Sequence, residues 1–245
     1  MKVAVLIPAA GSSSRFRHKT KKQFSEMNGR AVFLRTIELF ADRDDVSRIV
    51  IAIPAEDEEL FQIKWADSLA FHGVKAIIGG STRCETVKKL LAEVTDEVDL
   101  IALHDAVRPC VTGKHIDAVF AAAAETGAAI LAAPLVGTVK RAGPDGVIAE
   151  TVDRSELWEA QTPQVFKPDI IRRVYQQSSN DYADITDDAQ LVEAGGVTVK
   201  IVPGDSSNIK ITSDCDIAIT SAILKARPKP KPKGPAGPWA GEQGW

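Results

Sequence analysis

Short apolar runs alternate with amphipathic segments along the first 135 residues of the chain. The apolar runs are rich in β-branched residues and predict strands over residues 3–7, 48–53, 74–78, 99–103 and 129–133. Between these runs, apolar residues recur at helical spacing and predict helices over residues 32–40, 58–71, 87–94 and 116–124. The alternation indicates a Rossmann-like α/β fold, with a mostly parallel central sheet and helices on both faces.

The pattern changes after residue 134. Two short strand-like runs, 138–142 and 147–152, surround Gly143-Pro144-Asp145-Gly146, in which Pro-Asp-Gly is a turn signature. We therefore predict a projecting β-hairpin arm over about residues 136–154. An isolated hairpin is marginally stable in water, so we expect the arm to pack on another surface, such as a second subunit.

The remaining elements complete one domain over residues 1–225. Helices are predicted over 168–176, 187–194 and 213–225, and strands over 197–202 and 208–212. The chain has 245 residues, of which 44% are hydrophobic, and this is enough for a full core. Residues 226–245 are rich in Pro, Lys and Gly and cannot form a core, so we expect a disordered tail.

Charge and cysteine content narrow the range of functions. The net charge of −3 gives no electrostatic reason to expect binding to nucleic acid, which favours a small-molecule substrate. Three cysteines without CxxC spacing (Cys84, Cys110, Cys215) are typical of a reducing compartment. We find no signal-like segment and no apolar run of membrane-spanning length, and we expect a cytoplasmic protein.

The first candidate site is the loop over residues 8–23, directly after the first predicted strand. Small residues from Ala9 to Ser14 would let a nucleotide approach the backbone, and cations follow at Arg15, Arg17, Lys19, Lys21 and Lys22. The loop matches neither the P-loop nor the dinucleotide fingerprint. A solvated Ser-rich surface loop is the alternative. The position favours a polyphosphate site, because open α/β sheets bind ligands at the carboxyl ends of their strands.

A second candidate site follows the strand predicted over 74–78. Thr82 and Glu85 form a capping-box pattern, which predicts that a helix begins immediately after Gly79-Gly80-Ser81. The amino end of a helix at a strand end can bind an anion or the edge of a base.

Two charged residues near predicted strands are further candidates. Asp105 follows the strand over 99–103, with Arg108 one turn away, and it could hold Mg²⁺ or a substrate hydroxyl; the alternative is a helix cap with a surface ion pair. Lys210 lies between apolar neighbours in the strand predicted over 208–212. A lysine in a buried sheet is costly, which suggests a ligand role, whereas an edge strand would explain it without one.

Two polar residues have a less specific pattern. Arg154 offers a fork suited to a phosphate monoester, and Thr162 offers a hydroxyl donor. From the residues alone, both could equally be ordinary surface positions. The four histidines show no ligand-like spacing, so we assign no metal to them.

These motifs in series resemble the 2-C-methyl-D-erythritol 4-phosphate cytidylyltransferase family. The resemblance covers about residues 1–225, and no single motif carries it. The matching segments, in order, are Pro8-Ala-Ala-Gly11, Lys22-Gln23, Gly79-Gly80, Arg83, His104-Asp105-Ala106, Arg108-Pro109, Thr151-Val-Asp-Arg154, Gln161-Thr-Pro-Gln164, Ile185-Thr-Asp187 and Asn208-Ile-Lys-Ile-Thr212. The family usually has a glycine where this chain has Ser13 and a proline where it has Lys21, and some relatives have an acidic residue at the position of Ser207.

The resemblance implies an enzyme of the non-mevalonate isoprenoid precursor pathway. It would transfer the cytidylyl group of CTP to 2-C-methyl-D-erythritol 4-phosphate and release pyrophosphate, with Mg²⁺ or another divalent cation, as a homodimer whose arm reaches the neighbouring site. The residues implied are Arg15, Lys22 and Lys210 for catalysis; Pro8, Ala9, Ala10, Gly11, Gly80, Ser81, Arg83 and Thr86 for the nucleotide; Asp105, Arg108, Thr138, Lys140, Arg154, Thr162 and Thr186 for the second substrate; and Asp105 for the metal.

Three other functions remain open from the sequence. A ribitol 5-phosphate cytidylyltransferase needs the same phosphate and hydroxyl contacts. A nucleotidyltransferase that makes a sugar nucleotide from UTP or another nucleotide would differ mainly at the edge that reads the base. The chain could also be a catalytically silent nucleotide-binding module, although the presence of Arg15, Lys22, Asp105, Arg154 and Lys210 together argues against this.

Overall fold

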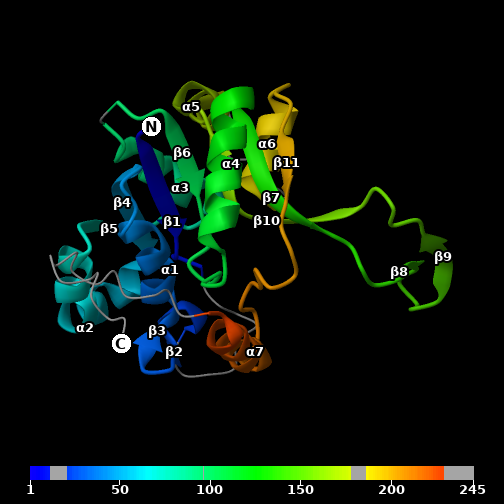
Figure 1. Cartoon of the computed structure of the whole chain (residues 1–245), viewed down its shortest axis with the longest axis horizontal. Helices are drawn as coiled ribbons and strands as arrows, with labels where there is room; N and C mark the ends of the chain where they lie inside the picture. Colours follow the sequence, from blue (N-terminus) through cyan, green and yellow to red (C-terminus); the bar gives the residue numbers. More distant parts are fainter. Residues whose placement is uncertain (12–20, 96, 178–185, 229–245) are drawn as a thin grey trace, which may run out of the picture.

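A seven-stranded sheet forms the centre of the molecule in the computed structural model (Figure 1). The structure describes residues 1–11, 21–95, 97–177 and 186–228. The predicted roles of Arg15, Arg17 and Lys19 lie outside the described residues, as does most of the tail predicted over 226–245, from residue 229 onwards. The strand order is β11-β7-β10-β6-β1-β4-β5. The strands are β1 (Val3–Pro8), β4 (Val46–Ile53), β5 (Val74–Ile78), β6 (Leu100–Leu103), β7 (Ala128–Pro134), β10 (Trp158–Phe166) and β11 (Lys200–Pro203).

The helices lie where apolar spacing predicted them, with small shifts at their ends. They are α1 (Val32–Ala41), α2 (Glu58–Phe71), α3 (Arg83–Ala92), α4 (Gly113–Thr126), α5 (Pro168–Gln177), α6 (Asp188–Ala194) and α7 (Asp214–Ala226). Helix α3 begins at Arg83, as the pattern of Thr82 and Glu85 predicted, and four residues before its apolar pattern; the Thr82 side chain accepts a hydrogen bond from the Glu85 N–H and caps it. In the described part of the chain, no helix has the length and apolarity that a membrane crossing requires.

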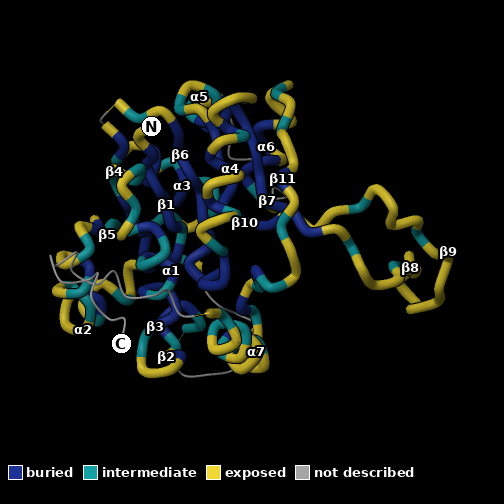
Figure 2. Tube along the Cα trace, in the orientation of Figure 1, coloured by how far each residue is buried: buried dark blue, intermediate teal, exposed yellow. Residues whose placement is uncertain are grey.

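The two faces of the sheet are covered by different helices. Val3, Val5 and Ile7 of β1 belong to the apolar cluster that includes α1, α2 and α4, whereas Ala4 and Leu6 belong to the cluster with α3, α5 and α6. Side chains alternate between the faces of a strand, so one continuous apolar run can serve both layers. The buried residues follow the sheet in Figure 2. This arrangement confirms the predicted α/β fold class.

Strand β1 lies at the point where the chain changes direction across the sheet. It pairs in parallel with β4 on one side and with β6 on the other, and β5 continues beyond β4. The loops that follow β1, β5 and β6 therefore meet at one edge, formed by the carboxyl ends of these strands. Such a switch point is where open α/β sheets bind ligands.

The structure corrects two sequence expectations. Strand β10 was not predicted; it runs antiparallel between β6 and β7, with an irregular register between Ala160 and Gln164. The strand predicted over 208–212 is absent from this described segment, which instead passes from β11 to α7 as an irregular loop. The loop makes a backbone hydrogen bond from the Ile211 N–H to the Val107 carbonyl, at 3.0 Å, without forming a strand ladder.

Helix α7 packs beneath this edge of the sheet. Its Ile217 and Leu224 contact an apolar cluster that contains Met27 and Ile211. Met27 belongs to the small hairpin of β2 (Glu26–Met27) and β3 (Arg30–Ala31). The end of the domain thereby supports the segment that carries Lys210.

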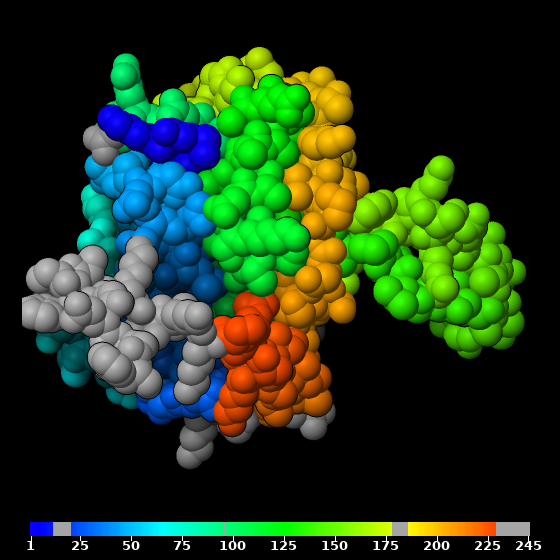
Figure 3. All heavy atoms as spheres, in the orientation of Figure 1, coloured from blue at the N-terminus to red at the C-terminus, as the bar shows by residue number. Residues whose placement is uncertain are grey.

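The β8–β9 hairpin stands apart from the body (Figures 1 and 3). Strands β8 (Val139–Ala142) and β9 (Ile148–Val152) form a separate two-stranded sheet, closed by a turn in which the Gly146 N–H donates to the Gly143 carbonyl. Its two legs leave the main sheet side by side, because Pro134 at the end of β7 pairs with Trp158 at the start of β10. Residues 140–151 are all exposed.

A fully buried histidine organises the turn that follows β6. The Asp105 N–H donates to the Thr162 hydroxyl at 3.0 Å, and the Thr162 oxygen lies 3.1 Å from Nδ1 of His104. Nε2 of the same ring lies 3.1 Å from the Arg108 carbonyl, which can only accept, so Nε2 carries the proton and Nδ1 accepts from Thr162. Burial lowers the pKa of His104 to about 4, so the ring is neutral at pH 7 and its Nδ1 accepts from the Thr162 hydroxyl.

The free energy of unfolding should therefore fall on mild acidification. Between the folded pKa of about 4 and the ordinary value near 6.5, the unfolded chain binds a proton that the native His104 does not, so stability rises with pH in this window. We expect a loss of about 2 kcal/mol from this group between pH 7 and pH 5. Urea unfolding at both pH values measures it.

The variant His104→Gln provides the control. It should be less stable at pH 7, but it should lack this part of the pH dependence. Asp105 does not confuse the comparison, because its lowered pKa contributes only below about pH 4. Equal slopes for the two proteins between pH 7 and pH 5 would show that His104 is not held neutral.

Candidate active site

A cavity of about 400 Å³ opens at the edge where β1, β5 and β6 end. The loop after β1, the 3-10 helix η1 (Lys22–Phe24), the start of α3, the turn after β6 and the segment before α7 all contribute to it. The lining residues are Pro8, Ala9, Ala10, Gly11, Lys22, Gln23, Gly80, Ser81, Thr82, Arg83, Thr86, Asp105, Ala106, Val107 and Lys210.

Close backbone packing shapes the wall between β1 and α3. A Cβ on Gly79 would lie 2.4 Å from the Ala10 Cβ, and one on Gly80 would lie 2.3 Å from the Glu85 Cβ, so neither position has room for a side chain. The Thr86 hydroxyl accepts from the Gly80 N–H at 3.0 Å and fixes the same turn. The glycines thus bring backbone, and not side chains, to the cavity.

Gln23 fastens the other wall. Its side-chain Nε2 donates to the Ala9 carbonyl at 2.9 Å and is buried. This hydrogen bond joins η1 to the residue that directly follows β1. Lys22 precedes Gln23, so the contact also fixes where the Lys22 backbone lies relative to the cavity.

Asp105 is the electrostatic centre of the site. Its carboxylate lies 2.9 Å from Nζ of Lys210, 3.3 Å from Nε of Arg108 and 3.8 Å from Nη1 of Arg83. Burial by itself would raise the pKa of Asp105, but the charges of Lys210, Arg83 and Arg108 hold this pKa far below its usual range. The carboxylate is therefore ionised, and it ties three segments of the chain together.

Arg83 connects the cavity to a second buried carboxylate. Its Nη2 lies 2.5 Å from Oδ2 of Asp188 at the start of α6, and the Tyr175 hydroxyl donates to the other oxygen, also at 2.5 Å. The charge of Asp188 raises the pKa of Arg83 further above its normal value. Arg83 is thus a permanent cation held between Asp188 and Asp105.

The Lys210 segment is held from below by a fully buried asparagine. Nδ2 of Asn208 donates to the Gln161 side-chain oxygen and to the Thr162 carbonyl, both at 3.0 Å. The Arg108 guanidinium donates to the Asn208 carbonyl at 2.7 Å. Lys210 itself is half-exposed, so a well-anchored loop presents a cation at the edge of the cavity.

The two ends of the cavity differ in polarity. At the α3 end, the Ser81 N–H and hydroxyl already donate to the Glu85 carboxylate at 2.8 and 2.7 Å, which makes this end unsuitable for an anion. The cations Lys22 and Lys210 come from other segments of the lining. The arrangement suits a nucleotide whose base faces the turn at Gly80 and whose phosphates face the lysines.

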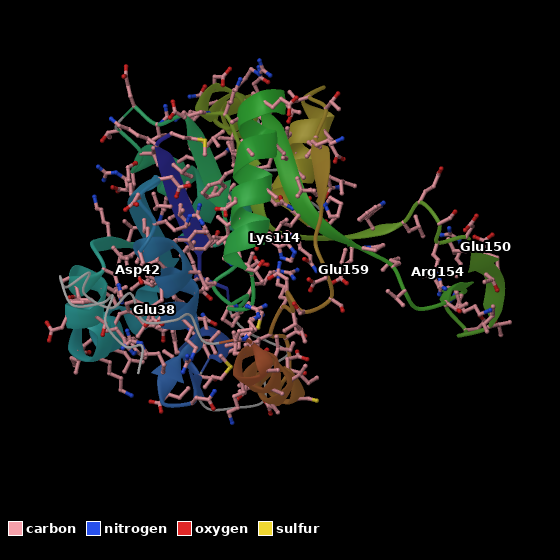
Figure 4. The ribbon with its side chains drawn as sticks, viewed as in Figure 1. Glu38, Asp42, Lys114, Glu150, Arg154 and Glu159 are labelled. Carbon is pink, nitrogen blue, oxygen red and sulfur yellow. The ribbon has the colours of Figure 1, made fainter. Side chains whose placement is uncertain are left out.

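Eleven of the site residues predicted from sequence line this one cavity: Pro8, Ala9, Ala10, Gly11, Lys22, Gly80, Ser81, Arg83, Thr86, Asp105 and Lys210. Arg108 and Thr162 lie behind it, buried, where they bind Asp105. Thr186 is exposed next to α6. Thr138, Lys140 and Arg154 lie on the arm, and Figure 4 shows Arg154 well away from the body.

Some residues of the site had not been singled out from the sequence. Gln23 and Ala106 belong to matching motifs but had no role assigned, and Thr82 had been considered only as a cap. Asp188 was missed entirely, because a carboxylate in a run of two aspartates resembles a surface helix start. Its burial depends on Arg83, which is 105 positions away along the chain.

The surroundings of Asp105 do not fit a protein-held Mg²⁺. Three cationic side chains face this carboxylate, whereas a magnesium site needs oxygen ligands with negative charge. Within residues 1–11, 21–95, 97–177 and 186–228, no three His, Cys, Asp or Glu side chains are grouped as metal ligands would be.

Known proteins are similar to this chain in both sequence and fold. A relative from Rhodopirellula baltica, named 2-C-methyl-D-erythritol 4-phosphate cytidylyltransferase, is 42% identical over 91% of this chain and 94% of its own length. One of the same name from Endomicrobium trichonymphae is 38% identical over 92% of this chain and its own full length. The crystal structure of the Thermus thermophilus protein of that name has 30% identity and a TM-score of 0.76, and the match covers 92% of this chain and 100% of that one.

The family model also matches nearly the whole domain. The model that describes 2-C-methyl-D-erythritol 4-phosphate cytidylyltransferase aligns with residues 3–226, from the first residue of β1 to the last residue of α7. The match includes the segments that line the cavity and the arm. This chain belongs to the 2-C-methyl-D-erythritol 4-phosphate cytidylyltransferase family.

Proposed function

We propose that this chain catalyses the reaction for which its family is named, the transfer of the cytidylyl group of CTP to 2-C-methyl-D-erythritol 4-phosphate. The products are 4-(cytidine 5'-diphospho)-2-C-methyl-D-erythritol and pyrophosphate, in the non-mevalonate isoprenoid precursor pathway. One observation carries the proposal: Lys22 and Lys210 line the same cavity as the glycine turn at Gly80, at the switch point of the sheet.

The reaction is an in-line displacement at phosphorus. An oxygen of the substrate phosphate forms a bond to the α-phosphorus of CTP, and the bond from that phosphorus to the β-phosphate oxygen breaks, which releases pyrophosphate. Negative charge grows on the oxygens around the α-phosphorus during this step. We assign Lys22 and Lys210 to these oxygens, because a fixed cation stabilises charge that develops in the transition state.

Asp105 and Arg83 act together in this proposal as the floor of the site. The Asp105 carboxylate holds the Lys210 ammonium at 2.9 Å, so it orients a catalytic cation, and its free lone pairs can accept from a substrate hydroxyl. Asp188 keeps Arg83 fixed beside it. We assign Asp105 no role as a protein ligand of Mg²⁺, because its charge is already neutralised by these cations.

In this proposal, the arm supplies further ligands for the second substrate. Arg154 was predicted to bind the substrate phosphate, yet it lies on the arm, where its guanidinium donates to the Val136 carbonyl. The exposed apolar side chains of Val136, Val147 and Ile148 also lie on the arm. We propose a homodimer in which each arm reaches the cavity of its partner and brings Thr138, Lys140 and Arg154 to it.

Substrate choice and location are proposals with different support. The family model and both relatives are named for methylerythritol phosphate, which favours this substrate over ribitol 5-phosphate. Lys22, Asp105 and Lys210 line the same cavity, which favours a catalyst over a silent nucleotide-binding module. A cytoplasmic location is inferred from the cysteines, since Cys84, Cys110 and Cys215 are all free thiols.

The first test is pyrophosphate release by the purified full chain with CTP and Mg²⁺. We expect turnover with methylerythritol phosphate and at least tenfold lower kcat/KM with ribitol 5-phosphate, and with UTP in place of CTP. Preference for ribitol 5-phosphate would reassign the second substrate. Binding of CTP without turnover of either polyol phosphate would support the silent module.

Removing either cavity lysine should slow the chemical step. Lys22→Ala and Lys210→Ala should each lower kcat by about 100-fold, while KM for CTP changes by less than about fivefold, because the charge that they stabilise grows in the transition state. Steady-state kinetics measures both constants. An unchanged kcat for either variant would remove that lysine from its assigned role.

Mixing two variants that are both impaired at polyol phosphate concentrations well below the raised KM tests whether the arm acts across subunits. Arg154→Ala should raise KM for the polyol phosphate and leave CTP affinity intact. A mixed dimer of Arg154→Ala with Lys22→Ala contains one site whose cavity and incoming arm are both intact, so activity should recover to about a quarter of wild type after exchange. No recovery in exchanged dimers would mean that Arg154 serves its own subunit.

A further inference from the structure

Lys21 forms a double ion pair next to the cavity. Its Nζ lies 2.5 Å from Oδ2 of Asp57 and 2.6 Å from Oε1 of Glu56. The Lys21 side chain is 22% exposed and that of Asp57 is 15% exposed, whereas Glu56 is largely in solvent. Asp57 is therefore the stronger partner, because a contact shielded from water is screened less by solvent and salt.

The ion pair joins two short helices at the edge of the sheet. Lys21 immediately precedes η1, and its partners belong to the 3-10 helix η2 (Ala55–Asp57), which follows β4. Strand β4 is an interior strand of the sheet, paired with β1 on one side and with β5 on the other. Asp57 is thus a firm anchor, whose N–H also donates to the Pro54 carbonyl.

The residues on the other side of Lys22 are also fixed. Gln23 donates to the Ala9 carbonyl, and the buried Phe24 ring packs against Phe33, Phe61 and Trp65, with ring centres 5.2 to 5.8 Å apart. Lys22 lies between these anchors and the Lys21 ion pair. Its backbone is therefore held from both directions, by burial on one side and by charge on the other.

Lys21 itself does not line the cavity, although Lys22 does. Burial opposes its charge, but the hydrogen bonds with Asp57 and Glu56 raise the pKa of Lys21 above its normal value, so it stays a cation. A cation already engaged by two carboxylates is a poor direct ligand for phosphate. Its geometry suits a fixing role for its neighbour instead.

We propose that Lys21 is a positioning residue for cytidylyl transfer, whose ion pair with Asp57 fixes the backbone from which Lys22 reaches the α-phosphate. The inference rests on the catalytic role proposed for Lys22. A displacement well below 1 Å in a reacting group is enough to slow a reaction several-fold, so a modest ion pair can have a large kinetic effect. Its effect on overall stability should be small, as for other partly exposed pairs.

The experiment is a double-mutant cycle in the full-length enzyme. Lys21→Gln and Asp57→Asn should each lower kcat three- to tenfold, with KM for CTP changed by less than about twofold. The double variant should be no slower than either single variant, because both changes break the same interaction. Lys21→Arg keeps the charge and should retain at least half of the wild-type kcat.

Lys75→Gln is the matched control. Lys75 pairs with Glu93 at 2.5 Å, but it lies near the amino end of β5, at the opposite edge of the sheet from the cavity. This variant should keep the wild-type kcat, and its Tm should shift about as little as that of Lys21→Gln. Measuring both kcat and Tm of the two variants distinguishes a positioning role from a general loss of structure, because only Lys21→Gln should lower kcat.

Three results would overturn the proposal. Wild-type kcat in Lys21→Gln would show that the ion pair does not matter, and multiplicative losses in the double variant would show that Lys21 and Asp57 act separately. Tighter CTP binding by Asp57→Asn would mean that Lys21, once released, binds phosphate directly. An inactive wild-type enzyme would instead contradict the proposed function, so the two failures are distinguishable.

Discussion

The ionised carboxylate of Asp105 is the contact on which the site depends. It lies at the end of β6, and the cations that surround it come from α3, from the turn after β6 and from the segment before α7. A buried carboxylate without partners would be strongly destabilising, so each segment has to keep its cation in place. The start of α3, which carries Arg83, and the segment that carries Lys210 thereby share one fixed point.

The polar residues around Asp105 form two layers, one that lines the cavity and one that lies behind it. The cavity layer contains Lys22, Arg83 and Lys210, whose charges face the space for a ligand. The layer behind it contains His104, Thr162 and Asn208, which are buried; the Thr162 hydroxyl bonds to His104, and the Thr162 carbonyl accepts from Asn208. Some of the motifs that the sequence groups into one site therefore line the cavity, and others lie behind it and hold the lining residues in place.

Most of the fold could be predicted because its strands and helices carry strong apolar periodicity. Strand β5 and helix α2 have the predicted bounds, and the other predicted helices differ from the observed ones only at their ends. Strand β10 was missed because Gln161, Thr162, Pro163 and Gln164 look like a surface turn, although all four are buried. Their polar groups are satisfied by partners distant in the sequence, which a local pattern cannot reveal.

The residues that line the cavity could be predicted from the sequence more completely than the buried residues behind them. Small residues after β1 and the cations at Lys22 and Lys210 are visible locally, whereas the burial of Arg108 depends on the Asn208 carbonyl, 100 residues away. Lys210 was expected on a strand because Ile209 and Ile211 alternate with it. Alternation alone cannot show whether a neighbouring strand is available to pair, and β11 ends at Pro203. The attachment of the arm at Pro134 and Trp158 has a mechanical consequence: a ribbon clamped at two adjacent points moves as a lever. A small twist of β7 against β10 displaces the tip far more than the base, so in the proposed homodimer the rigidity of this strand pair would set how accurately the Arg154 guanidinium reaches the partner's cavity.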